Sequence, residues 1–147
     1  SRYYTDNPIY PLESTVANLN IDMIGRLDDW HNNGNYVYLI GSDRLSYDLH
    51  DLNEKINDEY IGIDLDYRFN DKDDLNRYYY RSDHYNFAKN NIPVIFYFNG
   101  VHEDYHKPSD TIEKLDFDKI NTITTLIFLT AWEIANRDDR IKLRDDL

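Results

Sequence analysis

In PVIFYFNG, residues 93–100, five consecutive apolar residues follow the proline without a polar interruption. A run of this length predicts a strand that is buried on both faces, as in a parallel sheet covered by helices on each side. The polar sequence DYHKPSDT, residues 104–111, comes shortly afterwards. Its histidine, just beyond the expected strand, is either a solvated turn residue or a metal ligand.

The rest of the chain alternates between strand and helix patterns. Runs typical of strands occupy residues 15–25, 36–42 and 60–67, and two polar stretches, 26–35 and 70–77, are expected to be loops. Helical patterns occupy residues 46–60, 82–92 and 117–137. This alternation predicts an α/β sandwich that forms a single domain over residues 1–147.

The three expected helices have recognisable features at their ends or on one face. Ser46 can cap the helix over residues 46–60, and Ser82 or Asp83 lies near the start of the helix over residues 82–92. The last helix is amphipathic, so it is expected to pack on the sheet through one side. That side is predicted to carry Phe117, Ile120, Ile123, Ile127 and Ile134.

The composition is that of a globular domain with a strongly acidic surface. Hydrophobic residues make up 41% of the chain, and 28 acidic against 16 basic side chains give a net charge of −12. Such a field repels phosphate backbones, so no nucleic-acid partner is expected. No apolar stretch approaches the length of about twenty residues that a membrane span needs. The chain has no cysteine, so any metal must be bound by His, Asp or Glu.

Asp22 and His106 are the strongest candidate metal ligands, because each follows a predicted strand. In open α/β sheets, ligands bind beyond the carboxyl ends of the strands. An aspartate within NIDMIG, residues 20–25, is costly to bury unless it is paired or coordinated, and aspartate and histidine both suit zinc. The simpler alternatives are a strand-end carboxylate that caps a loop and a solvated turn histidine.

Other combinations of reactive residues give weaker signals. His102 and His106 are four residues apart, but Gly100 and Pro108 indicate a loop rather than a helical zinc motif. Asp110 and Thr111 are expected to close an Asx-type turn or to cap the next segment, which would brace the loop that presents His106.

The sequence RSDH, residues 81–84, has the letters of a Ser-Asp-His triad, but triad members meet through the fold rather than as neighbours in sequence. The preceding cluster YYY, residues 78–80, is usually packing, although a phenol can stabilise an oxyanion.

The order of these segments resembles that of the co-catalytic di-zinc aminopeptidase family, which includes bacterial leucyl aminopeptidases, glutamate carboxypeptidase and the protease-like domain of transferrin receptor. The resemblance rests on NIDMIGR (20–26), RSDHYNFAKNNIPVIFYFNG (81–100) and HEDYHKPSDT (102–111), followed by a long helix. It implies a three-layer α/β sandwich, with a mixed, mostly parallel sheet flanked by helices and incomplete at its N-terminal side.

The resemblance also implies roles for individual residues. Asp22 and His106 would each bind one of two zinc ions, and a tyrosine, by spacing Tyr79 or else Tyr80, would contact the substrate carbonyl. Asp83 borders the active site in the family, and Asp110 would support the metal-binding loop. The expected partner is a peptide substrate, hydrolysed at its N-terminal peptide bond.

The chain also departs from the family pattern. Members carry a His-x-Asp motif upstream, whose aspartate bridges the metals, and then a Glu-Glu pair that supplies the general base and a ligand; neither precedes Asp22 here. We therefore expect the C-terminal part of a larger catalytic domain, which is inactive by itself and binds zinc weakly or not at all. An exposed sheet edge would then favour self-association.

Two alternatives remain on the same scaffold. One is a glutaminyl cyclase, which uses a single zinc ion, and the other is a non-catalytic binding domain, although such a domain has no need of Asp22 and His106. Many relatives are secreted or periplasmic, which is the expected compartment by resemblance alone.

Overall fold

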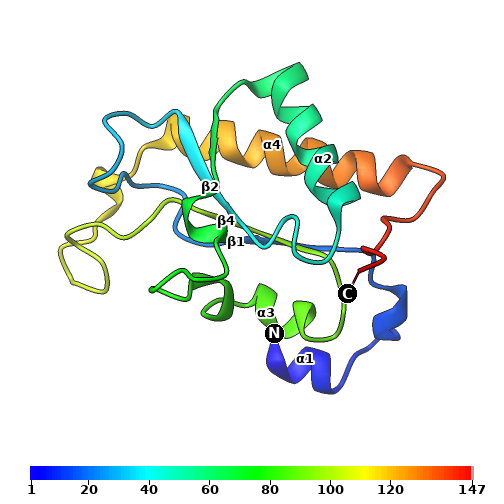
Figure 1. Cartoon of the computed structure of the whole chain (residues 1–147). Helices are drawn as coiled ribbons and strands as arrows, with labels where there is room; N and C mark the ends of the chain where they lie inside the picture. Colours follow the sequence, from blue (N-terminus) through cyan, green and yellow to red (C-terminus); the bar gives the residue numbers. More distant parts are fainter. Residues whose placement is uncertain (147) are drawn as a thin grey trace.

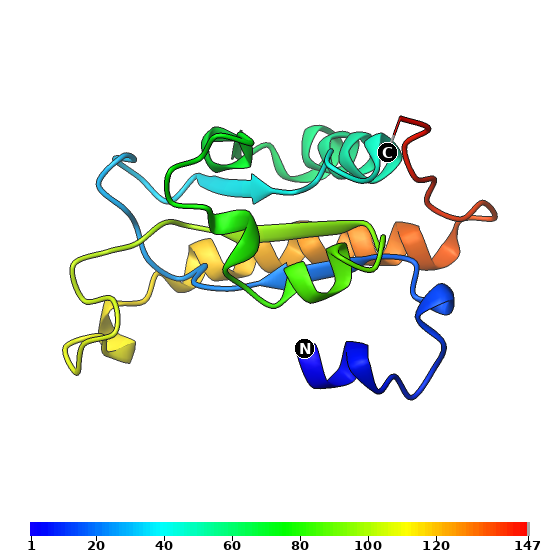
Figure 2. The same ribbon diagram turned by 60° about the horizontal axis from the view of Figure 1, so that its bottom comes forward.

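In the computed structural model, which describes residues 1–146, a four-stranded sheet lies between two layers of helices (Figure 1, Figure 2). The strands are β1 (Asn18–Ile21), β2 (Tyr36–Ile40), β3 (Asp64–Asp66) and β4 (Val94–Phe98). The α-helices are α1 (Arg2–Asp6), α2 (Tyr47–Ile56), α3 (His84–Ala88) and α4 (Phe117–Asn136). Single helical turns occur at η1 (Leu12–Ser14), η2 (Asn57–Ile61), η3 (Arg68–Asn70), η4 (Tyr78–Tyr80) and η5 (Ile112–Lys114). The predicted three-layer α/β sandwich is confirmed.

The sheet is mixed, and its strand order is β1-β4-β2-β3. β4 runs parallel to β1 but antiparallel to β2, while β2 and β3 are parallel. The parallel environment expected for the 93–100 stretch therefore exists on one side of β4 only. As a result, β1 and β4 end at one edge of the sheet, whereas β2 and β3 end at the opposite edge.

β4 is completely buried because both faces of the sheet are covered. Ile95 and Tyr97 face the layer of α2 and α4, while Val94, Phe96 and Phe98 face the layer that contains α3 and η4. Burying one large apolar side chain contributes roughly 1.5–3 kcal/mol to stability. An uninterrupted apolar strand is thus explained by two helical layers rather than by parallel neighbours on both sides.

A buried polar contact joins the sheet to both helices of the upper layer in Figure 1. The Tyr97 hydroxyl donates to Asn53 Oδ1 at 2.6 Å, and the Thr130 hydroxyl donates to the same oxygen at 3.1 Å. Tyr97 lies on β4, Asn53 on α2 and Thr130 on α4. Since unpaired polar groups are costly in a core, this shared acceptor fixes the positions of the two helices over the sheet.

Two helix predictions hold apart from one residue of α4, whereas the helix predicted over residues 82–92 covers only His84–Ala88. Ser46 caps α2 as expected, because its hydroxyl accepts from the Leu49 N–H at 3.0 Å. Phe117 is 59% exposed, so placing it on the buried side was wrong. The buried stripe passes instead through Lys119 and Ile123, and residues two apart on an α-helix point about 200° apart.

Two strand predictions were too long. The first strand covers Asn18–Ile21 of the predicted 15–25, and the third covers only Asp64–Asp66 of 60–67. In the second case the turn η2 continues the preceding helix to Ile61, and Gly62, with φ +75°, reverses the chain before β3 begins. No helix among residues 1–146 is both long and apolar enough to cross a membrane.

His84 should make folding stability depend on pH. The side chain is fully buried and stacks on Phe96, and burial lowers its pKa to about 4 from an ordinary value of 6.5. The unfolded chain therefore binds a proton that the folded protein excludes, and stability present above pH 6.5 is lost as pH falls towards 4. One such proton changes the free energy of unfolding by about 1.4 kcal/mol per pH unit.

Urea unfolding between about pH 4.5 and 7 measures this slope. His84→Phe keeps a flat ring against Phe96 but cannot titrate. The free energy of unfolding of this variant should therefore change less with pH than that of the unsubstituted protein, by about 1.4 kcal/mol per pH unit. An equal slope in both proteins would assign the pH dependence to another group.

Candidate metal centre

A hollow of about 410 Å³ opens at the edge of the sheet where β1 and β4 end. Two loops form it, one after each strand. Asp22 directly follows β1, and His106 lies in the loop after β4. The fold thus brings the two predicted zinc ligands to the walls of one cavity, whose lining residues are Asp22, Met23, Gly25, Arg26, His102, Tyr105, His106, Lys107, Asp110 and Leu115.

Asp22 extends the pairing of β1 by one residue and then leaves the sheet. Its N–H donates to the Tyr97 carbonyl at 3.3 Å, while Oδ2 accepts from the Ser82 hydroxyl at 3.0 Å. Ser82 is oriented in turn by the Asn20 side-chain amide, which donates to it at 3.0 Å. The Asp22 side chain is exposed to solvent, so it carries no burial cost, and it keeps an oxygen available for a cation.

His106 occupies a strained position in a tight turn. The Lys107 N–H donates to the Asp104 carbonyl at 2.8 Å, which places His106 third in the turn with φ +58°. A positive φ at this position is the requirement of a type II turn, which usually selects Gly or Asn. The imidazole is exposed and stacks on Tyr105, with ring centroids 3.8 Å apart. Met23, beside Asp22, has φ +58° as well, and such strain is concentrated at functional sites.

Arg26 holds the two loops together. Its guanidinium donates to Asp104 Oδ2 at 2.7 Å and to Asp110 Oδ1 at 2.6 Å, both in the loop after β4. Lys114 Nζ donates to both Asp104 oxygens at 2.8 Å. The hydrogen bonds from Lys114, Ser109 and Arg26 together hold the pKa of Asp104 far below its usual range. Asp110 is thus bonded to Arg26 rather than closing the expected Asx-type turn, and its role in supporting a metal-binding loop stays a prediction.

His102 lies between this clamp and the cavity. Its side chain is 6% exposed, and its Nε2 is 3.7 Å from Asp110 Oδ2. Within residues 1–146, its buried Nδ1 has no hydrogen-bond partner. Burial and the neighbouring Arg26 lower the pKa of His102. The segment from His102 to His106 is a series of turns, which confirms that the pair is not a helical zinc motif.

A buried carboxylate supports the same loop from behind. Asp28 accepts hydrogen bonds from His31 Nδ1 at 3.0 Å and from the Tyr38 hydroxyl at 2.5 Å, and the Tyr36 hydroxyl lies 3.2 Å from Oδ1. Burial would raise the pKa of Asp28, but these hydrogen bonds outweigh it and the pKa is lowered. Gly100, the second residue after β4, packs directly on this carboxylate.

Two predicted site residues lie away from the cavity wall. Tyr79 is 8% exposed, with the Arg44 guanidinium 4.0 Å from its ring centroid, and burial raises its pKa to about 12. Asp83 points to solvent, where Oδ1 accepts from the Ser1 hydroxyl at 2.6 Å. Their roles at the active site stay predictions.

Two other tyrosines do line cavities near Asp22. Tyr105 lines the 410 Å³ cavity, and Tyr78 lines a smaller cavity of about 70 Å³ to which Asp22 also contributes. The RSDH segment forms no triad, because Ser82 bonds to Asp22 and the His84 ring is packed in the core.

The donors in this cavity suit zinc in kind, since a carboxylate and an imidazole are ordinary zinc ligands. Catalytic zinc usually has three protein ligands. Among residues 1–146, a single group of three His, Asp or Glu side chains has potential ligand atoms within 4.8 Å of one another. This group is His50, Asp51 and Glu54, which lie outside the cavity. A complete centre at the cavity therefore requires ligands beyond Asp22 and His106.

Sequence reasoning missed the residues that position the ligands. Arg26, Asp104, Lys114 and Asp28 look like solvated loop charges in the sequence, and nothing in their spacing indicates that they pair. Their role comes from ion pairs and hydrogen bonds between segments far apart in the chain.

Comparisons with known proteins identify the family and similar folds. Residues 1–131 match peptidase family M28, so the chain belongs to that family. The fold is similar to the LapA aminopeptidase of Legionella pneumophila, with a TM-score of 0.69 and 22% identity over 94% of this chain and 34% of that one. It is also similar to BSAP, a zinc aminopeptidase from Bacillus subtilis, with a TM-score of 0.68 and 18% identity over 99% of this chain and 35% of that one. A comparison with curated protein sequences gave no match. The chain thus spans about a third of the length of these two structures.

Replacing Gly100 with alanine should loosen the loop that carries His106. Gly100 has φ +86°, and an added Cβ would lie 2.7 Å from Asp28 Cβ. Backbone strain and this overlap together should lower the free energy of unfolding by about 2–4 kcal/mol.

Gly62→Ala is the matched control. Gly62 also has a positive φ, but nothing lies within 4 Å of the position that an added Cβ would take, so only the conformational penalty of about 1–2 kcal/mol applies. Urea denaturation of both variants gives the difference. An equal decrease in the free energy of unfolding of both variants would mean that Asp28 can move away from the added methyl group without a measurable penalty.

Proposed function

We propose that the chain contributes to the catalytic centre of a zinc-dependent aminopeptidase. The observation that carries this proposal is that Asp22 and His106, which are far apart in the sequence, line one cavity beyond the ends of two paired strands. Membership of a peptidase family supports hydrolysis of a peptide bond. Aminopeptidase activity is named for both proteins of similar fold and zinc for BSAP, and both are extended to this chain as part of the proposal.

Each residue at the cavity has a defined task in this proposal. Zinc, when bound, supplies a more acidic water and polarises the substrate carbonyl. Asp22 and His106 bind the two ions, one each, while Arg26 keeps their loops together through Asp104 and Asp110. Ser82 holds the Asp22 carboxylate in one orientation, leaving the other oxygen free.

The bridging carboxylate, the general base and the remaining ligands are proposed to come from a larger catalytic domain, of which this chain is the C-terminal part. The chain contains no Glu-Glu pair, and no His-x-Asp motif precedes Asp22. Without a base positioned at the water, hydrolysis is slow even when metal is bound. The chain alone is therefore proposed to bind zinc only weakly at the cavity and to be inactive.

Zinc titration by calorimetry tests the site directly. Asp22→Ala and His106→Ala should each weaken or abolish binding at the cavity, because each removes one of its two ligands. Asp29→Ala removes an exposed loop carboxylate instead and serves as the control for lost charge. Unchanged binding in both cavity variants would contradict the assignment of the ligands.

Activity assays separate the related reactions. A protein that contains the missing motifs should hydrolyse an amino-acid anilide rather than cyclise a glutaminyl peptide, and it should lose most activity with Asp22→Ala. Comparing Tyr78→Phe with Tyr79→Phe identifies the phenol that contacts substrate, since kcat falls only for the one that does. Robust hydrolysis by the present chain, abolished by Asp22→Ala, would overturn its proposed inactivity.

We also propose that the chain self-associates through the free edge of β1. β1 is the first strand of the sheet and pairs with β4 on its other side, and Ile21 at its end is 48% exposed. Unpaired strand edges with exposed apolar side chains favour pairing with a second chain.

Light scattering should then show a dimer, and Ile21→Lys should shift it towards the monomer by placing a charge on the edge. Ile112→Lys adds the same charge at an exposed isoleucine outside the sheet and should leave the dimer intact. A monomer at all accessible concentrations would rule out the edge contact.

A further inference from the structure

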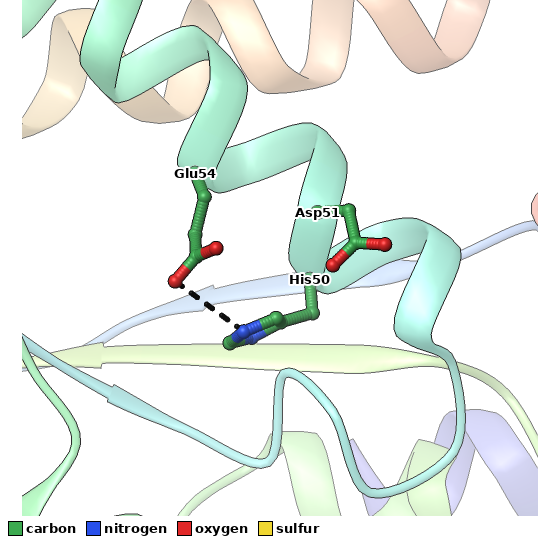
Figure 3. Close-up of side chains that lie close together, drawn as sticks. All are labelled: His50, Asp51 and Glu54. Carbon is green, nitrogen blue, oxygen red and sulfur yellow. Dashed lines mark ion pairs between the residues drawn. The ribbon is translucent and has the colours of Figure 1, made fainter.

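A second group of metal-competent side chains lies on α2, outside the cavity. His50, Asp51 and Glu54 project from neighbouring positions of the helix, and one potential ligand atom of each lies within 4.8 Å of the others (Figure 3). His50 and Glu54 are four residues apart, so they share one face of α2. Asp51 comes from the position next to His50, and its carboxylate is exposed.

The closest pair has a spacing that a tetrahedral metal ion would accept. His50 Nε2 is 3.4 Å from Glu54 Oε1, and Figure 3 shows the two groups facing each other. Two ligands held at about 2.0–2.1 Å from a tetrahedral zinc lie about 3.4 Å apart, so this pair needs little rearrangement. The pair also leaves room on its outer side, since Glu54 is 43% exposed.

Residues from outside the helix orient both ligands. Ser42 Oγ lies 2.9 Å from His50 Nδ1, which leaves Nε2 free to face Glu54. The Tyr67 hydroxyl donates to Glu54 Oε1 at 2.8 Å. Ser42 follows β2 and is 1% exposed, and Tyr67 follows β3. Hydrogen bonds of this kind, from a second layer to a histidine and a carboxylate, are a regular feature of metal sites.

The topology separates this group from the cavity. Ser42 and Tyr67 follow the ends of β2 and β3, and these strands end at the edge opposite to the ends of β1 and β4. The group can therefore be tested without the zinc ligands Asp22 and His106. A net charge of −12 also favours cations over anions at such a surface.

We propose that His50, Asp51 and Glu54 form a binding site for a divalent transition-metal ion of the zinc type. An imidazole with two carboxylates suits zinc, cobalt or nickel better than magnesium or calcium, which prefer oxygen ligands alone. The bound ion joins three side chains of α2, two of which are held by Ser42 and Tyr67, in the segments that follow β2 and β3. Its role is structural, because it ties the helix to the ends of β2 and β3.

The test uses the double variant Asp22→Ala, His106→Ala, which removes the cavity ligands and makes the result independent of the proposed function. Calorimetric titration with Zn²⁺ should show one ion bound per chain. Adding His50→Ala or Glu54→Gln should abolish this binding, and Ser42→Ala should weaken it by about tenfold through loss of orientation. Glu59→Gln removes a carboxylate from the same helical segment, next to Lys55, and should leave the binding constant unchanged.

Thermal unfolding provides the second readout, because an ion that binds only the folded chain raises the midpoint. Zn²⁺ should raise the midpoint of the double variant but not that of the same protein with His50→Ala added, and Mg²⁺ at the same concentration should have no effect. Equal responses to Zn²⁺ and Mg²⁺ would show general attraction to acidic residues and overturn the proposal. Absence of zinc binding in the double variant, or binding that survives His50→Ala, would overturn it as well.

Discussion

The buried carboxylate of Asp28 constrains the end of the sheet at which β1 and β4 end and the cavity opens. A buried charge needs hydrogen-bond donors to replace water. Asp28 accepts hydrogen bonds from His31 and Tyr38, and the Tyr36 hydroxyl lies beside the same carboxylate. Gly100 fits against the carboxylate with almost no spare space. The start of β2 and the exit of β4 are therefore fixed relative to each other, and the loop that carries His106 begins from a rigid point.

The directions of the strands place the two groups of candidate metal ligands at opposite ends of the sheet. β4 has a parallel neighbour in β1 and an antiparallel neighbour in β2, so two edges of one small sheet receive different loops. One edge gathers Asp22 and His106, and the other gathers the residues that orient His50 and Glu54. A wholly parallel sheet would have placed the loops after all its strands at the same edge. The antiparallel pair thus separates the cavity from the group on α2.

The cavity is built from loops, which need support that strands obtain from their ladder hydrogen bonds. Arg26 supplies it by bonding to two aspartates of the opposite loop, and Lys114 completes the neutralisation of Asp104. Two residues with positive φ, Met23 and His106, show that the backbone is bent at both ligand-bearing loops. The ion pairs of Arg26 join these two loops, so the positions of Asp22 and His106 relative to each other depend on charges outside the cavity's two candidate ligands.

The sequence was enough to predict the layered α/β fold, the helix cap at Ser46 and the positions of Asp22 and His106 in segments that follow two strands. These follow from local patterns: apolar period, capping chemistry and the order of motifs. Only the tertiary structure decided that β4 is antiparallel to β2, that Phe117 faces solvent, and that Arg26 and Asp28 hold the loops of the cavity. The direction of strand pairing and the ion pairs between distant residues depend on which segments meet in space. The ion pairs could not be predicted because each charged residue, considered alone, resembles an ordinary solvated charge.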